Sequence, residues 1–308
     1  MMRLGLNVPD TVLVPYKHPV DNARWAYTSA RYNRSFDLEQ IAEPLGYPLY
    51  MKPFDGGGWR GVSQVRDRAD LHRSYDDSGE MLMHLQASVP DYEHFARSLT
   101  IGPETMVMKF RPEEPMHERY SVTHGFLSES AGFQAAAISR IVNAFFLWEF
   151  NSAEMLVTGD DVYPIDYANA CPDVAVTSLH YYFPWAITAL ARWSTYCVVT
   201  GRRADVDLQT QRYFAVADDA SLSYDDKMDR YLALADEHFE TERYWEWSDR
   251  HLAHLPEAVL EWVTGHDFDR LLRDTVAATY PAHEQEEFLA HFRGLVGLWA
   301  SEQTGVAG

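Results

Sequence analysis

The chain has 308 residues, 46% of them hydrophobic, and a formal net charge of −20. Its length predicts two domains or one elaborated domain, and its negative charge argues against a nucleic-acid partner, because phosphate backbones repel it. Two cysteines are too few for a disulfide framework and form no metal pattern, so a cytoplasmic location is expected. The most apolar stretch, 180–199, contains Pro184 and Arg192 and predicts a buried helix, not a membrane span.

The first third of the chain alternates strand and helix patterns. Strands are predicted over 11–15, 47–53, 61–65 and 81–86, and a helix over 37–45. Asp67 is predicted to cap a second helix that ends near Asp76, because an aspartate before such a run accepts hydrogen bonds from the first free backbone amides.

The middle of the chain predicts two pairs of antiparallel strands around a helix. Strands over 95–102 and 104–110 meet at Gly102-Pro103, and strands over 148–157 and 161–167 meet at a Thr-Gly-Asp turn. The intervening helix is predicted over 133–147. After Asp173 the pattern becomes helical, with a capping box at Ser223 and a last helix over 284–299.

The most informative motif runs from Lys52 to Val62, Lys-Pro-Phe-Asp-Gly-Gly-Gly-Trp-Arg-Gly-Val. A lysine ends a short apolar run, and a loop with four glycines and one arginine follows. Glycines let backbone N–H groups turn toward an anion, and Lys52 and Arg60 add charge for polyphosphate oxygens. The motif therefore predicts a nucleotide phosphate site. It lacks the Gly-Lys-Ser/Thr of a Walker A loop, and a plain hairpin turn is the alternative.

Two acids downstream interrupt runs that are otherwise apolar: Glu154 in the strand over 148–157 and Asp166 in the strand over 161–167. An acid in a buried run needs a partner, and a bound cation is one such partner. Mg²⁺ prefers one or two carboxylates together with phosphate oxygens and water. The pair therefore predicts a magnesium site, with a helix cap or a salt bridge as the alternative for either acid.

The order of these features resembles the ATP-grasp superfamily of carboxylate–amine ligases, including the D-alanine–D-alanine and ribosomal-protein-modifying types. The shared order is a lysine on a strand, a glycine loop, a strand, a helix, a strand ending in glutamine, an arginine-containing hairpin, and paired acids with an asparagine. The resemblance implies an α+β, ATP-grasp fold in which two α/β subdomains clasp the nucleotide, with a mostly helical C-terminal extension. The nucleotide-binding region would span 1–175 and the helical region 176–308.

The resemblance also implies roles for individual residues. Those expected to bind ATP, through the lysine, the loop, the adenine hinge and the acid nearest the ribose position, are Lys52, Gly56, Gly57, Gly58, Arg60, Gly61, Gln86, Ala87, Ser88, Val89 and Glu93. Those expected to hold Mg²⁺ are Glu154, Asp166 and Asn169. Arg97 would stabilise the transferring phosphoryl group or the acyl phosphate, and Lys52 and Arg60 would act on the phosphates. Lys109 on the neighbouring predicted strand is a candidate to assist, with a solvated surface lysine as the alternative.

Three departures from the family pattern stand out. The family usually has acid-x-Asn, whereas this chain has Asp166-x-x-Asn169. Residues three apart on a strand face opposite sides, so Asn169 is expected beyond the strand end if it is a ligand at all. Phe95 stands where the family often has an acid. The chain also begins near the nucleotide-binding part, so the family's separate N-terminal domain is either absent or replaced by the helical C-terminal half.

The implied reaction is ATP-dependent formation of an amide or peptide bond from a carboxylate and an amine through an acyl phosphate. The substrates would be small-molecule or peptide acids and amines, neither nucleic acid nor membrane is an expected partner, and the N-terminal edge suggests a homodimer. Tyr167, His180, Tyr181 and Tyr182 are candidates to line the acceptor pocket, with core packing as the alternative. Two other functions stay open: an ATP-binding relative without ligase activity that acts as a regulatory or partner-binding module, and an interaction protein built on the aromatic helical half.

Overall fold

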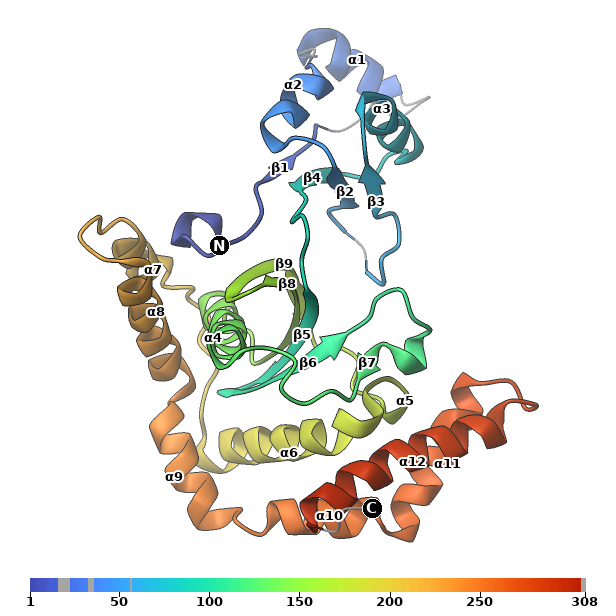
Figure 1. Cartoon of the computed structure of the whole chain (residues 1–308). Coiled ribbons are helices and arrows are strands. Elements are labelled where there is room, and N and C mark those ends of the chain that lie inside the picture. Colours follow the sequence, from blue (N-terminus) through green and yellow to red (C-terminus); the bar gives the residue numbers. More distant parts are fainter. Residues whose placement is uncertain (16–22, 33–35, 56, 306–308) are drawn as a thin grey trace. The chain divides into compact units, whose positions relative to one another are not determined.

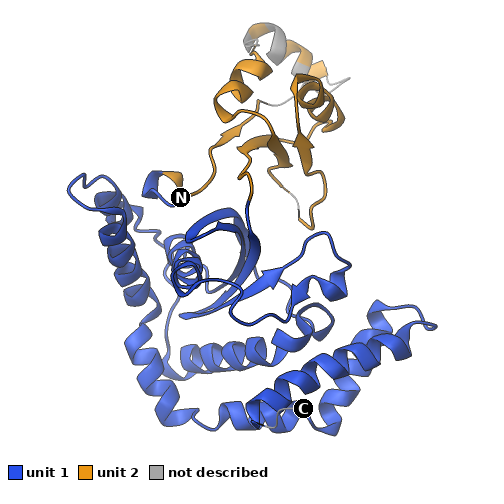
Figure 2. Ribbon diagram, in the orientation of Figure 1, with its two compact units in different colours: residues 1, 3–6, 92–308 blue, residues 2, 7–91 orange. Residues whose placement is uncertain are grey.

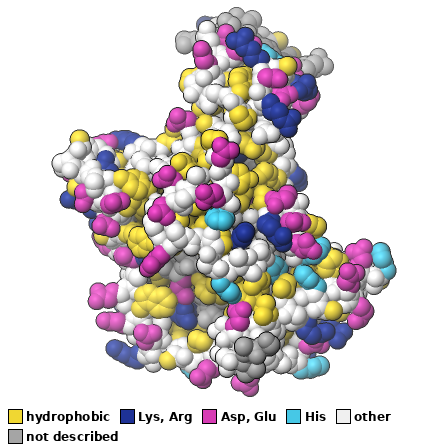
Figure 3. Space-filling model, viewed as in Figure 1, with side chains coloured by type: hydrophobic (Ala, Val, Ile, Leu, Met, Phe, Trp, Pro, Cys, Tyr) yellow, Lys and Arg dark blue, Asp and Glu magenta, His cyan; other side chains and the backbone are white. Residues whose placement is uncertain are grey.

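The computed structural model of the protein describes residues 1–15, 23–32, 36–55 and 57–305 (Figure 1). The chain forms two compact units (Figure 2). The smaller unit consists of residues 7–91 with residue 2, and the larger unit consists of residues 92–308 with residues 1 and 3–6. On the face drawn in Figure 3, acidic side chains are scattered among basic and apolar ones on both units, so the charge of −20 is not gathered into one patch of this face.

The smaller unit is an antiparallel sheet packed against short helices. Its strands are β1 (Thr11–Leu13), β2 (Leu49–Pro53), β3 (Ser63–Val65) and β4 (Met83–Ala87), in the order β1-β4-β2-β3. Its helices are α1 (Ala23–Tyr32), α2 (Leu38–Ala42), the 3₁₀ turn η2 (Glu43–Leu45) and α3 (Arg68–Asp77). The predicted strand over 61–65 is shorter than expected, because residues 58–61 form turns.

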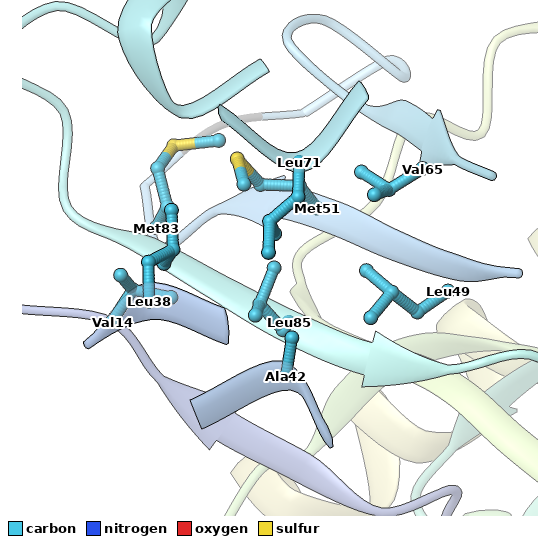
Figure 4. Close-up of a cluster of buried hydrophobic side chains, with 9 residues drawn as sticks. All are labelled: Val14, Leu38, Ala42, Leu49, Met51, Val65, Leu71, Met83 and Leu85. Carbon is cyan, nitrogen blue, oxygen red and sulfur yellow. The ribbon is translucent and has the colours of Figure 1, made fainter. Parts of the chain in front are cut away.

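Alternation along the strands gives this sheet one apolar and one polar face. Figure 4 shows the core on the apolar face, where side chains of β2, β3 and β4 meet others from α2, α3 and the residue after β1: Val14, Leu38, Ala42, Leu49, Met51, Val65, Leu71, Met83 and Leu85. Neighbours along the same strands, including Lys52 and Gln86, point to the opposite face, because successive side chains of a strand alternate. The core therefore fixes which side chains the polar face presents.

Asp67 caps helix α3 as predicted: its side chain accepts a hydrogen bond of 2.8 Å from the backbone N–H of Asp70. We expect Asp67→Ala to lower the free energy of unfolding of this unit by about 1 kcal/mol, because the first turn then keeps an unpaired amide. Denaturant unfolding measures the loss. Asp77→Ala, at the other end of the same helix, is the control and should leave stability unchanged or slightly raised, since an acid opposes the helix dipole there. Equal losses in both variants would contradict the capping role.

The larger unit is built on a five-stranded antiparallel sheet in the order β7-β6-β5-β8-β9. The strands are β5 (His94–Ile101), β6 (Glu104–Phe110), β7 (Tyr120–Ser121), β8 (Phe150–Thr158) and β9 (Asp161–Ala170). Both predicted strand pairs are confirmed, β5 with β6 and β8 with β9. Between the two pairs in the chain, the 3₁₀ turn η3 (Met116–Glu118) precedes β7.

Helix α4 (Glu129–Phe146) covers one face of this sheet (Figure 1). It begins four residues earlier than predicted, because the Ser128 side chain caps it by accepting from Ala131. Two buried contacts tie it to the strands: Ser139 donates to Ser98 at 2.7 Å, and Asn151 donates to Asn143 at 3.0 Å. Residues on the other face of the strands, among them Arg97, are thereby left to face away from α4.

The rest of the larger unit is helical, as predicted. The elements are α5 (Val176–Leu179), η4 (His180–Tyr182), α6 (Phe183–Thr200), α7 (Thr210–Ala217), α8 (Tyr224–Phe239), α9 (Thr241–His251), α10 (Leu255–Val263), α11 (His266–Thr279) and α12 (Gln285–Gln303). The predicted capping box at Ser223 is present. None of the helices in the described ranges has the length and apolar character that crossing a bilayer requires.

The fold class is therefore α+β with a mostly helical C-terminal part. The compact units divide near residue 91, inside the region 1–175, and the helices after 176 belong to the same unit as the sheet of β5 to β9. Helix α6 packs on this sheet through Trp193, which lies against Gly102 in the β5–β6 turn. The helical part thus supports the turn between β5, which carries Arg97, and β6.

Candidate active site

On the polar face of the smaller unit, Lys52 and Gln86 are brought together by the pairing of β2 with β4. The Nζ atom of Lys52 donates to Oε1 of Gln86 at 2.7 Å, and Nε2 of Gln86 donates to the Thr11 hydroxyl at 3.2 Å. Gln86 is buried, so both ends of its amide are used to hold neighbours. The predicted phosphate lysine and the predicted adenine hinge are therefore adjacent in space.

The rest of the predicted hinge continues from β4. The N–H of Ala87 donates to the carbonyl of Asp10 at 2.8 Å, so this amide is engaged within the unit. Ser88 and Val89 follow the strand end and are half-buried. Backbone groups of Ser88 and Val89 are thus the better candidates for contact with a base.

The glycine loop is a series of turns between β2 and β3. Gly56 lies outside the described residues. Gly58 and Gly61 have φ of 64° and 75°, and Trp59 between them has φ of 65°. Turns in which right-handed and left-handed residues adjoin, as Arg60 and Gly61 do here, can direct successive backbone N–H groups toward one side, an arrangement that binds anions. Arg60 is exposed, and both its backbone N–H and its Nε donate to the carbonyl of Gly57, so it is held by its own loop.

On the larger unit, three residues of the predicted site lie side by side on neighbouring strands. Arg97 on β5 is directly opposite Glu154 on β8, and Glu154 is directly opposite Asp166 on β9. Nη1 of Arg97 is 3.5 Å from Oε1 of Glu154. Asp166 is exposed and makes no hydrogen bond or ion pair with the described residues. This row, on the face away from α4, leaves a carboxylate available for a cation.

Asn169 lies inside β9 and not beyond it, so the expected position was wrong. It stands opposite Ser152, while Asp166 stands opposite Glu154, so three steps on β9 match two steps on β8. The extra residue is a β-bulge, which restores the alternation and returns Asn169 to the face of Asp166. The unusual Asp-x-x-Asn spacing is therefore accommodated by the bulge.

Ser152 connects this asparagine to the arginine. Its hydroxyl accepts from Nδ2 of Asn169 at 2.8 Å and from Nη2 of Arg97 at 3.1 Å. The Arg97 guanidinium also lies over the rings of Phe110 and Tyr120, 5.2 and 5.8 Å from their centroids. Sequence reasoning missed Ser152 and Tyr120, because a serine in a strand and an aromatic residue near a turn carry no spacing signal.

These oxygens fit a hard divalent cation. Glu154, Asp166 and the Oδ1 atom of Asn169 are carboxylate and amide oxygens on one face, and no described residue donates to that Oδ1. No cluster of three or more His, Cys, Asp or Glu side chains suited to a metal occurs among the described residues. Mg²⁺ is nevertheless usually bound through one or two carboxylates, with phosphate oxygens and waters completing its coordination, and these oxygens suit it.

The positions of Glu93 and Lys109 do not directly support the roles predicted for them. Glu93 precedes β5, and its carboxylate accepts from the N–H of Gly159 at 3.3 Å, so it already stabilises the β8–β9 turn. Its ribose role stays a prediction. Lys109 is opposite Ala96 on the α4 side of the sheet, so the expected help to Arg97 from Lys109 is wrong.

The aromatic residues considered for the acceptor pocket are mostly packed in the core. His180, Tyr181 and Tyr182 are buried, and Nδ1 of His180 accepts from the backbone N–H of Tyr181 at 2.8 Å. Burial, with His291 and His117 nearby, lowers the pKa of His180 to about 4, so this imidazole is neutral at physiological pH. Tyr167 is half-buried on β9.

No protein-family model matches the chain. Among solved structures, it is similar to a D-alanine–D-alanine ligase from Bacillus anthracis complexed with ATP, with a TM-score of 0.44 and 14% identity over 77% of this chain and 63% of that one. It is also similar to a biotin carboxylase from Campylobacter jejuni, with a TM-score of 0.38 and 19% identity over 58% of this chain and 40% of that one. A third is the N5-carboxyaminoimidazole ribonucleotide synthetase from Thermus thermophilus, with a TM-score of 0.36 and 18% identity over 54% of this chain and 42% of that one.

This chain thus spans less than two thirds of each of these structures. At such low identity and TM-scores, the ATP-grasp resemblance rests on this chain's own strand order and side chains. The strand order has the lysine strand beside the glutamine strand, and the arginine strand beside the Glu154 strand, which lies in turn beside the Asp166 strand.

Proposed function

We propose that the chain is an ATP-grasp ligase that joins a carboxylate to an amine. The observation that carries the proposal is the row of Arg97, Glu154 and Asp166 on adjacent strands, with Asn169 returned to their face by a bulge. Such a row combines a cation for a transferring phosphoryl group with oxygens for a metal.

The chain's residues then have distinct tasks. Lys52, held by Gln86, would bind the α- and β-phosphates, while Arg60 and the N–H groups of the glycine loop would cover the β- and γ-phosphates. Ser88 and Val89 would present backbone groups to adenine. Glu154, Asp166 and Asn169 would hold Mg²⁺, whose contribution is to neutralise phosphate charge.

The proposed reaction has two transfers. A substrate carboxylate oxygen attacks the γ-phosphorus, the bond to the β–γ bridging oxygen breaks, and ADP leaves. An amine then attacks the acyl carbon, inorganic phosphate leaves with the carbonyl–oxygen electron pair, and the amine loses a proton. Phosphoryl transfer depends mainly on positioning and charge, so a side-chain nucleophile is not required. Arg97, fixed by Ser152, Glu154 and two aromatic rings, is suited to the oxygens of the transferring group.

An ATP-binding relative without ligase activity is the competing proposal. Its best support in the sequence is the Asp-x-x-Asn spacing together with Phe95, and the bulge at β9 reduces the first of these. Phosphate release from ATP in a screen of carboxylic acids with amines separates the two proposals, because a regulatory relative would bind ATP and release none.

The first test is thermal unfolding of the wild-type protein and Asp166→Ala with ATP, with and without Mg²⁺. A ligand at a hundredfold excess over its dissociation constant stabilises a folded protein by about 2.7 kcal/mol, so the wild type should gain a Mg²⁺-dependent rise in melting temperature. Asp166→Ala should lose most of that rise, because one charged metal ligand is missing.

Asp161→Ala is the matched control, since Asp161 is an exposed aspartate at the start of the same strand. It should respond to ATP and Mg²⁺ as the wild type does. Absence of any response in the wild type would overturn the proposed function. A wild-type response that persists in Asp166→Ala would instead remove Asp166 from the metal site.

A further inference from the structure

Ser152 occupies the centre of the candidate metal face without being a metal ligand or a charged group. It is 3% exposed, on β8 between Asn169 of β9 and Arg97 of β5. Its hydroxyl accepts two hydrogen bonds, from Nδ2 of Asn169 and from Nη2 of Arg97. One buried oxygen thus holds two of the residues that the proposed function needs.

The direction of the bond to Asn169 matters because an asparagine amide has two different ends. Nδ2 is a donor and cannot ligate a cation, whereas Oδ1 can. Since Ser152 engages Nδ2, the amide is oriented with Oδ1 away from Ser152, and no described residue donates to that oxygen. A rotated amide would present its hydrogens to a cation.

The same Ser152 hydroxyl also holds Arg97. A guanidinium can only donate, so the Ser152 oxygen accepts from it, and a second donor from Asn169 uses the other lone pair. The guanidinium is further held over Phe110 and near Glu154. Arg97 and Asn169 therefore share one anchor, which ties the position of the cationic group to that of the amide.

We propose that Ser152 is a positioning residue, which orients the Asn169 amide for Mg²⁺ and holds Arg97 beside it. The inference rests on the proposed function, because it gives Asn169 a metal to bind. Removal of an outer partner of a metal ligand costs about 10- to 100-fold in metal affinity or activity. Ser152 should therefore control the Mg²⁺ requirement of ATP binding although it touches neither.

The test is a titration of ATP affinity against Mg²⁺ concentration by calorimetry, on the full chain. We expect Ser152→Ala to raise the Mg²⁺ concentration for half-maximal ATP binding by about 10- to 100-fold. Affinity measured without Mg²⁺ should be unchanged, because Lys52 and Gln86 are intact. Asn169→Ala should show a similar rise, and the double variant should show no more than Asn169→Ala alone, since the two residues act as one unit.

Ser98→Ala is the matched control. Ser98 is an equally buried serine of the same sheet, but its hydroxyl lies on the α4 face with Ser139. It should keep the wild-type Mg²⁺ dependence whatever it does to stability. If Ser152→Ala fails to fold, the isosteric pair Ser152→Thr and Ser152→Val answers the same question, because only threonine keeps the hydroxyl and should retain the wild-type Mg²⁺ dependence.

The outcomes separate this inference from the proposed function. A wild type that binds ATP with Mg²⁺, together with an unchanged Mg²⁺ requirement in Ser152→Ala or in Ser152→Val, would overturn the role of Ser152 alone. Additive effects of Ser152→Ala and Asn169→Ala would also overturn it. A wild type that does not bind ATP at any Mg²⁺ concentration would overturn the proposed function and this inference with it.

Discussion

Gly102→Ala should destabilise the larger unit by more than about 4 kcal/mol, an unusually large effect for one methyl group. Gly102 forms the β5–β6 turn with φ of 53°, a conformation that residues with a Cβ rarely adopt. A Cβ at this position would overlap the Trp193 indole, at 2.8 Å from Cε2 and closer to two other ring atoms. Trp193 is buried in α6 among Tyr196, Phe239 and Tyr244, so it has no room to move away.

Gly159→Ala separates the cost of the left-handed backbone conformation from the cost of the overlap with Trp193. Gly159 forms the β8–β9 turn of the same sheet with φ of 57°, but a Cβ there meets nothing within 4 Å. It should lose only the conformational cost, about 1–2 kcal/mol. Chemical denaturation of both variants, read by tryptophan fluorescence, gives the difference. Similar losses in the two variants would show that the Trp193 contact is not what makes Gly102 necessary.

The local elements of this fold could be predicted because they depend on nearby residues. Asp67 and Ser223 cap their helices, and Gly102-Pro103 turns its hairpin, since each acts within a few residues of itself. Lys52 and Gln86 were assigned to one binding site from the resemblance, and the pairing of β2 with β4 joins them. Alternation along each strand predicts that Lys52 lies on the face opposite Met51 and Gln86 on the face opposite Leu85, whereas the pairing of the two strands is seen only in the structure.

The positions that could not be predicted depend on the register between neighbouring strands. The bulge at β9 shifts Asn169 relative to Asp166, and alternation alone gives the opposite face. Ser152 lies between Arg97 and Asn169 only because of the register of β8 with β9. Lys109 lies on the face opposite to Arg97 because of the register of β5 with β6. The alternation of side chains along a strand predicts which face of the sheet each residue occupies, but only up to a β-bulge. The sequence carries no separate signal for the bulge.

Arg97→Met should lower the rate of phosphate release about 10²- to 10³-fold with any acid–amine pair that supports it, while ATP binding with Mg²⁺ is largely kept. A fixed donor aimed at charge that develops in the transition state contributes an effect of this size. Arg97 is suited to that role because Ser152, Glu154 and the rings of Phe110 and Tyr120 hold it before any ligand binds. Its guanidinium therefore needs no reorganisation during transfer.

Arg140→Met is the matched control. The Arg140 side chain is 21% exposed and paired with Asp236, much as the Arg97 side chain is 18% exposed and paired with Glu154, but it lies on helix α4, on the other face of the sheet. Its loss should cost stability and leave the rate of phosphate release per folded molecule unchanged. An equal fall in rate for both variants would mean that Arg97 acts through folding. A fall in ATP affinity that accounts for the whole effect of Arg97→Met would place Arg97 in ground-state binding, because an interaction made only in the transition state lowers the rate without lowering affinity.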